Sequence, residues 1–230
     1  MTTLKDVQRA LLVRGYDIGP AADDGLGGPA TYGAMLRAIN EHVPLPPVVK
    51  PPKVADPIGM VPMVWMPWAQ MERIIVHWTV GRHEANSTDR AHYHLIIEGE
   101  GNLVRGVHSI VANESAADGD YAAHVSGLNT GSIGVSLCGM LGAKESPFDA
   151  GSFPITRKQW DVLPMVLADL CRRYAIPVTR QTVLTHAEVQ PTLGVKQRGK
   201  WDITRLPWDD GVRGALVVGN QMRAAVTALL

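Results

Sequence analysis

Beyond residue 57, short apolar runs alternate with longer amphipathic stretches. Aliphatic and β-branched residues dominate at about 73–79, 92–97, 103–107, 132–138 and 182–186, a length typical of buried strands. Between them, Thr156 can cap a helix in which apolar residues recur every three or four positions up to Tyr174. A further helix is expected over 212–230. This order predicts an α/β fold with a single mixed β-sheet flanked by helices.

The first 43 residues show a different pattern. Val7, Leu11 and Leu12 are spaced to share one helix face, and Pro29 is suited to open a second helix. These features predict a small all-α module, and so short a segment buries little apolar surface.

A proline-rich run separates the two regions. Residues 44–57 hold prolines at a density that excludes helix and central strand and favours an extended spacer. We therefore predict a helical module over 1–43, a linker over 44–57 and the α/β domain over 58–230.

Composition limits the partners. Hydrophobic residues make up 46% of the 230 residues, and 22 basic residues balance 22 acidic ones. A chain of zero net charge is not expected to bind nucleic acid, and no stretch approaches the about 20 apolar residues that span a bilayer. We expect a monomer without stable membrane association. The start of the chain lacks a secretory pattern, and two cysteines fit a reducing compartment, so cytoplasmic synthesis is expected.

Two histidines and one carboxylate form the candidate chemistry. His77 and His186 each follow a predicted strand, and an irregular segment after His186 leads to Asp202. Catalytic zinc needs three protein ligands and one open position. These residues predict one Zn²⁺ per chain, although a single strand-terminal histidine is more often a hydrogen-bonded core or surface residue.

Other hydrolytic chemistries find less support. The chain has no His-Glu-x-x-His helix motif and no Gly-x-Ser-x-Gly turn. Cys138 lies in an apolar run without the electropositive surroundings that activate a thiol, so we interpret Cys138 and Cys171 as buried hydrophobic residues.

Five ordered segments carry a family resemblance. They are Ile75-Val76-His77-Trp78-Thr79, His92-Tyr93-His94-Leu95-Ile96-Ile97, the block from His124-Val125-Ser126-Gly127 through Asn129 to Ser132-Ile133-Gly134-Val135, Leu184-Thr185-His186-Ala187-Glu188-Val189, and Lys200-Trp201-Asp202. Together they resemble the type 2 N-acetylmuramoyl-L-alanine amidases, a group that includes phage lysozyme-amidases and peptidoglycan recognition proteins.

The resemblance implies specific roles. It implies zinc held by His77, His186 and Asp202, with Tyr93 and Lys200 at the reaction centre; a tyrosine packed in a strand is the alternative for Tyr93. His124 and Asn129, in a loop-like segment, are expected to contact substrate.

The N-terminal region carries a second, shorter resemblance. Residues 8–12, Gly15-Tyr16 and residues 24–31 resemble the small helical peptidoglycan-binding domain, although Leu36-Arg37-Ala38-Ile39 departs from its usual aromatic ending. A helical hairpin that only tethers or packs on the enzyme is the alternative.

These observations predict a zinc-dependent endolysin acting on the cell wall after release during host lysis. Its expected reaction is hydrolysis of the amide between N-acetylmuramic acid and the L-alanine of the stem peptide. A non-catalytic peptidoglycan-binding protein, a recycling amidase acting on soluble anhydromuramyl-peptides, and a thiol hydrolase centred on Cys138 are the alternatives.

Overall fold

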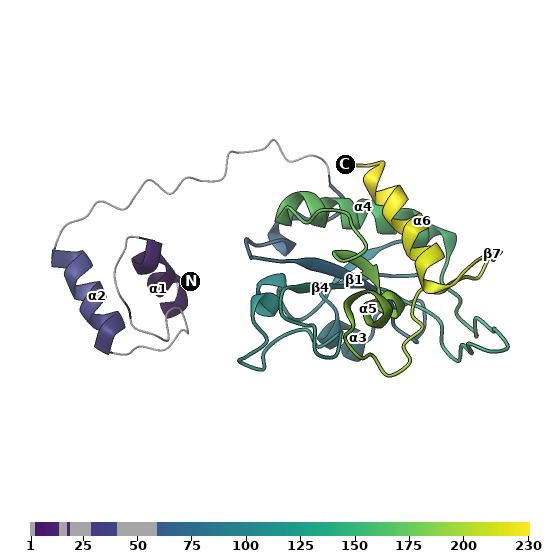
Figure 1. The fold of residues 1–230 in the computed structure, drawn as a ribbon, viewed down its shortest axis with the longest axis horizontal. Helices are drawn as coiled ribbons and strands as arrows, with labels where there is room; N and C mark the ends of the chain where they lie inside the picture. The colour runs from purple at the N-terminus through teal and green to yellow at the C-terminus, as the bar shows by residue number, and fades with distance from the viewer. Residues whose placement is uncertain (1–2, 14–17, 19–28, 41–58) are drawn as a thin grey trace. The chain divides into compact units, whose positions relative to one another are not determined.

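The computed structural model describes residues 3–13, 18, 29–40 and 59–230. The chain divides into two compact units, 1–55 and 56–230 (Figure 1). The predicted linker over 44–57, the turn residues before Pro29 and His42 lie outside the described residues.

The first unit contains two helices, α1 (Leu4–Val13) and α2 (Pro29–Asn40). Pro29 opens α2 as expected, and Leu11, Ile18 and Ala34 form a small buried cluster. Leu12 was expected on the same face as Leu11, but it is 41% exposed. This small core agrees with a module of limited intrinsic stability.

The second unit is built on one mixed sheet, which confirms the predicted fold class. Its strands are β1 (Arg73–Trp78), β2 (Leu95–Ile97), β3 (Leu103–Arg105), β4 (Ser132–Leu137) and β5 (Val183–Thr185), in the order β3-β2-β4-β1-β5. The pairings of β1 with β4, β1 with β5 and β2 with β4 are parallel, whereas β3 runs antiparallel to β2. Because β1 and β4 are covered on both faces, every residue in them except Arg73 is buried, and most are apolar.

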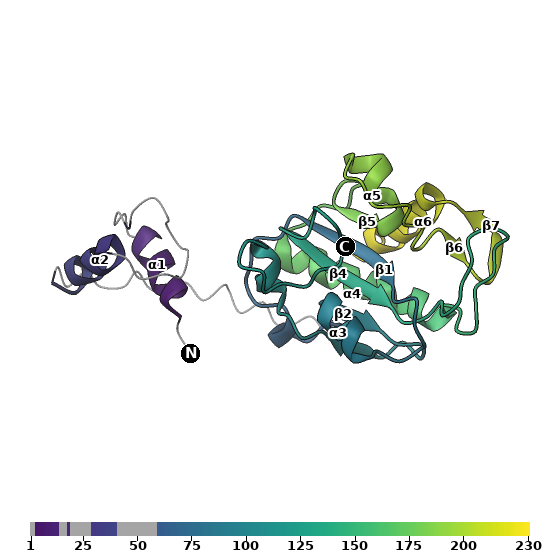
Figure 2. The same cartoon turned by 90° about the horizontal axis from the view of Figure 1, so that it is seen from below.

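Helices cover both faces of this sheet. In Figures 1 and 2, α4 (Arg157–Tyr174) and α6 (Ala215–Thr227) lie on one face, while α3 (Ser87–His92) and α5 (His186–Leu193) lie on the other. The predicted cap of α4 is present, because the Thr156 hydroxyl accepts a hydrogen bond from the Gln159 N–H at 3.2 Å. Two short 3₁₀ helices (Met63–Trp65 and Ile110–Glu114) and a hairpin of β6 (Arg205–Leu206) and β7 (Asp209–Arg213) complete the unit. Among the described residues, the structure has no helix both long and apolar enough to span a membrane.

Several elements differ from the sequence expectation. The strand expected from residue 92 begins at Leu95, because α3 occupies the preceding residues. A reciprocal capping box starts α3: the Asp89 N–H donates to Asn86 Oδ1, and the Asn86 N–H donates to Asp89 Oδ2, both at 3.0 Å. The segment after His186 forms α5, and the last helix starts at Ala215 because β7 extends to Arg213.

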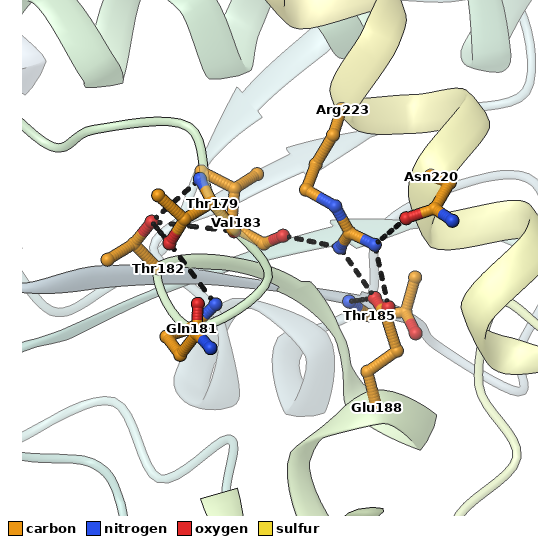
Figure 3. A network of polar contacts seen from close by, with 8 residues as sticks. All are labelled: Thr179, Gln181, Thr182, Val183, Thr185, Glu188, Asn220 and Arg223. Atoms are coloured by element: carbon orange, nitrogen blue, oxygen red, sulfur yellow. Dashed lines mark hydrogen bonds and ion pairs between the residues drawn. The ribbon is translucent and has the colours of Figure 1, made fainter. Parts of the chain in front are cut away.

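A buried ion pair joins α5, α6 and β5 (Figure 3). Arg223 donates to both carboxylate oxygens of Glu188 at 2.9 and 2.8 Å, and to the Val183 carbonyl at 2.9 Å. Glu188 also accepts from the Thr185 N–H at 3.0 Å, at the start of α5. The network therefore fixes the turn at which the chain passes from β5 into α5.

A glycine makes room for this pair. A Cβ added to Gly219 of α6 would lie 2.1 Å from Glu188 Oε2. Because Arg223 and the Thr185 N–H both donate to Glu188 Oε2, that oxygen cannot simply move away. Gly219 is thus required where α6 passes the carboxylate.

We expect Arg223→Leu to lower the free energy of unfolding by about 3–5 kcal/mol, because it leaves the Glu188 carboxylate buried without its cation. Urea denaturation measures the change. The control Lys158→Ala removes the exposed Lys158–Glu100 pair and should cost less than about 1 kcal/mol. An equally small loss for both variants would contradict the role assigned to the buried pair.

Candidate active site and metal centre

The candidate ligands meet at the carboxyl ends of two adjacent parallel strands. Val76 of β1 is paired with Thr185 of β5, so the next residues, His77 and His186, lie side by side. His186 is also the first residue of α5. Asp202 reaches the pair from the segment that follows α5. The structure thus brings together the three residues that the sequence singled out.

Their donor atoms face one another. His77 Nδ1 lies 2.9 Å from His186 Nδ1, and Asp202 Oδ2 lies 3.2 Å from His186 Nδ1 and 3.6 Å from His77 Nδ1. A tetrahedral zinc ion with bonds of about 2.0–2.1 Å separates its ligand atoms by about 3.3 Å. All three residues are at most 6% exposed. Two imidazoles and a carboxylate at these separations can hold one zinc ion.

The ionisation of the site suits a cation. Burial lowers the pKa of His77 to about 4, so its ring is neutral at pH 7. Burial alone would raise the pKa of Asp202, but its contacts with the His186 and His77 rings hold it below its usual range. A neutral imidazole and an ionised carboxylate are the forms that bind metal.

Packing on either side holds Asp202. The Trp201 ring meets Trp78 of β1 edge to face, with centroids 4.8 Å apart. Ile203 is fully buried with φ +60°, a backbone conformation that is unfavourable for a β-branched residue. Asp202 is therefore anchored on both sides, although the segment carrying it has no regular structure.

Tyr93 lies beside the first ligand. It is the C-cap residue that follows α3, two positions before β2 begins, and its ring centroid is 5.1 Å from that of His77. Burial raises the pKa of Tyr93 above its ordinary value, so the phenol stays protonated at neutral pH. Tyr93 thus lies beside His77, although it was expected within a strand, and its role at the reaction centre stays a prediction.

Lys200 is exposed on the same segment as Asp202. Burial is the main cause that lowers the pKa of His77, and the positive charge of Lys200 adds a smaller lowering. An ammonium in this position can stabilise negative charge that develops on a substrate held at the centre.

His124 and Asn129 have protein partners in the structure. His124 is 7% exposed, and its Nδ1 lies 3.1 Å from His77 Nε2. The Asn129 side-chain oxygen accepts from the N–H groups of His124 and Val125, both at 3.0 Å. Their roles as substrate contacts stay predictions.

One residue at the site was not anticipated. The Gln197 side-chain oxygen lies 3.0 Å from His186 Nε2, and Gln197 is buried. A single glutamine within an irregular segment carries no sequence signal that distinguishes it from its neighbours.

The surroundings of Cys138 disfavour the alternative of a thiol hydrolase. Its side chain is fully buried, and burial raises the pKa of the thiol to about 12. A thiol that stays protonated at neutral pH is a poor nucleophile.

Comparison with known proteins identifies the family of this chain. Residues 67–203 match the family described as N-acetylmuramoyl-L-alanine amidase. No match was found among curated protein sequences.

Three solved structures illustrate the likeness. The endolysin amidase LysCS from Clostridium intestinale URNW is 15% identical, with 69% of this chain and 85% of that chain covered and a TM-score of 0.42. The endolysin of Thermus scotoductus MAT2119 bacteriophage Ph2119 is 15% identical, with 55% and 78% covered and a TM-score of 0.38. The E. coli amidase AmiD, in complex with an anhydro-N-acetylmuramic acid peptide, is 18% identical, with 52% and 49% covered and a TM-score of 0.35.

The family match spans more than half of the chain and includes His77, His186 and Asp202. The chain therefore belongs to the N-acetylmuramoyl-L-alanine amidase family.

Proposed function

We propose that the protein is a zinc-dependent peptidoglycan amidase that cleaves the bond between N-acetylmuramic acid and the L-alanine of the stem peptide. The observation that carries this proposal is the convergence of two imidazole nitrogens and one carboxylate oxygen in a buried cluster. The family match supports the same reaction class.

The residues around the centre have separate roles in the proposed reaction. His77, His186 and Asp202 would hold a zinc ion, which would supply a Lewis acid that lowers the pKa of water and polarises a carbonyl. The Tyr93 phenol is a neutral donor beside His77 and can orient the substrate carbonyl. The Lys200 ammonium stabilises the oxyanion and assists protonation of the departing amine.

Two alternatives share parts of this site. A recycling amidase would use the same ligands on soluble anhydromuramyl-peptides, and digestion of intact sacculi separates that activity from wall hydrolysis. A non-catalytic binding protein has no need of a complete set of three ligands, which this chain possesses. The two-unit organisation supports an enzyme directed to an insoluble polymer, and the endolysin context stays a prediction.

The metal is the first test. We expect about one zinc ion per chain in the wild-type protein, and His186→Ala should abolish both stoichiometric zinc and amidase activity because a buried ligand is lost. Elemental analysis after zinc repletion and desalting measures the metal. The control His83→Ala removes a histidine that contacts the Pro154 carbonyl, and it should retain zinc. A folded wild-type protein without stoichiometric metal would overturn the proposal.

Lys200 is the second test. Lys200→Ala should lower kcat about 100-fold or more, since an oxyanion donor is typically worth about 3–4 kcal/mol. Zinc content and the unfolding transition should stay unchanged, because Lys200 is exposed. Steady-state kinetics on a soluble muramoyl-peptide measure the effect, with exposed Lys196→Ala as the matched control. Equal activity of the two variants would remove Lys200 from the mechanism.

The N-terminal unit is the third test. Deleting residues 1–55 should weaken sacculus binding and sacculus hydrolysis, because the unit raises the local enzyme concentration on the polymer. Turnover of a soluble muramoyl-peptide should stay near that of the full chain. Pull-down with purified sacculi and parallel kinetics measure both effects. Unchanged sacculus binding would show that the unit does not bind the wall.

A further inference from the structure

Each candidate histidine ligand uses its second ring nitrogen for another buried contact. The Nδ1 atoms of His77 and His186 face each other and Asp202, so their Nε2 atoms point away from the centre. His77 Nε2 meets His124 Nδ1 at 3.1 Å, and His186 Nε2 meets Gln197 Oε1 at 3.0 Å. Both supporting residues are at least nine-tenths buried.

The surroundings of Gln197 determine which way its amide points. The Gln197 nitrogen lies 2.9 Å from the Ser126 carbonyl and 3.4 Å from the Val195 carbonyl. Carbonyl oxygens only accept hydrogen bonds, so the NH₂ group must face them. The amide oxygen then faces His186, whose Nε2 must carry the proton. In the neutral ring, this leaves the lone pair on Nδ1, directed at the centre.

The tautomer of His77 follows from the same reasoning, with the His124 ring between His77 and a backbone carbonyl. His124 Nε2 lies 3.3 Å from the Ser132 carbonyl, which can only accept, so His124 carries its proton on Nε2. His124 Nδ1 is then the acceptor for His77, which must donate from Nε2. The lone pair of His77 is therefore also on Nδ1.

Both lines of contact end on one segment of the chain. The Ser126 and Ser132 carbonyls belong to residues 122–132, the connection that leads into β4. Asn129 folds this connection through the His124 and Val125 N–H groups, and Asn113 donates to the Ala122 and Asn129 carbonyls. The segment is thus a hydrogen-bonded support and not only a surface loop.

Gly134 lets the His124 ring lie against β4. A Cβ at this position would stand 2.6 Å from the His124 ring, so a side chain there would displace it. A glycine within the buried strand β4 is explained by this close approach.

From this geometry we infer that His124 and Gln197 are positioning residues that fix the tautomer and orientation of His77 and His186, with residues 122–132 as their common support. The inference rests on the proposed zinc site and extends it. An acceptor that contacts the second ring nitrogen of a ligating histidine raises the basicity of that histidine, and its loss typically weakens metal binding about 10–100-fold.

Zinc affinity tests the inference independently of activity. In the full chain, competition with a fluorescent chelator should show a dissociation constant about 10–100-fold higher for Gln197→Leu and for His124→Leu. His124→Asn retains an oxygen that can accept from His77, and it should restore most of the affinity lost in His124→Leu. A folded Gln197→Leu or His124→Leu protein with wild-type affinity would overturn the role of that residue.

Another buried glutamine provides the matched control. Gln159 is fully buried and donates to the Ile97 and Cys138 carbonyls, both at 2.8 Å, without contact with a ligand. Gln159→Leu should lower the unfolding transition while leaving the zinc dissociation constant unchanged. Equal losses of zinc affinity in Gln159→Leu and Gln197→Leu would show that the effect is general destabilisation.

Long-range ¹H–¹⁵N correlation spectra of the zinc-loaded wild type report the tautomers directly. We expect the proton on Nε2 of both His77 and His186, whereas a proton on Nδ1 of either ring would overturn the inference. A wild-type protein that binds no zinc would instead refute the proposed function, so the two failures are distinguishable.

Discussion

The parallel pairing of β1 with β5 is the constraint on which the site depends. Its register places Val76 beside Thr185, so the next residue of each strand is a histidine at the same edge of the sheet. A shift of one residue would turn His77 to the opposite face of the sheet. The register is specified by the buried apolar residues of β1 and β5, which pack against helices on both faces. The core of the domain thus determines the geometry of its chemistry.

That geometry carries an energetic cost which a cation removes. Two imidazole lone pairs and a carboxylate oxygen directed at one point repel each other, and burial strengthens the repulsion because little water is present to screen it. The surrounding fold must therefore hold the ligands in place. The Glu188–Arg223 pair fixes the start of α5 at His186, and the contact of Trp201 with Trp78 fixes the approach of Asp202.

The sequence predicted the features that depend on strongly patterned segments. The five strands and the long helix after Thr156 were recognisable because their apolar residues repeat with a clear period. The helices α3 and α5 were missed because six and eight residues are too few to show a helical period. The candidate ligands could be recognised in the sequence, since each has a distinctive residue type at a strand end or in a specific motif.

The roles of the supporting residues were harder to predict from the sequence, for a physical reason. Gln197 and His124 act through the direction of a hydrogen bond, and that direction is set by backbone carbonyls at Ser126 and Ser132, which no side-chain pattern reveals. The sequence placed His124 in a loop-like segment and therefore suggested contact with substrate. The His124 ring can be buried against β4 because Gly134 has no side chain. The need for a glycine at this position is visible only when the segment that carries His124 packs on β4. The ligands of such a centre are thus readable from local patterns, whereas the orientation of those ligands is a property of the folded chain.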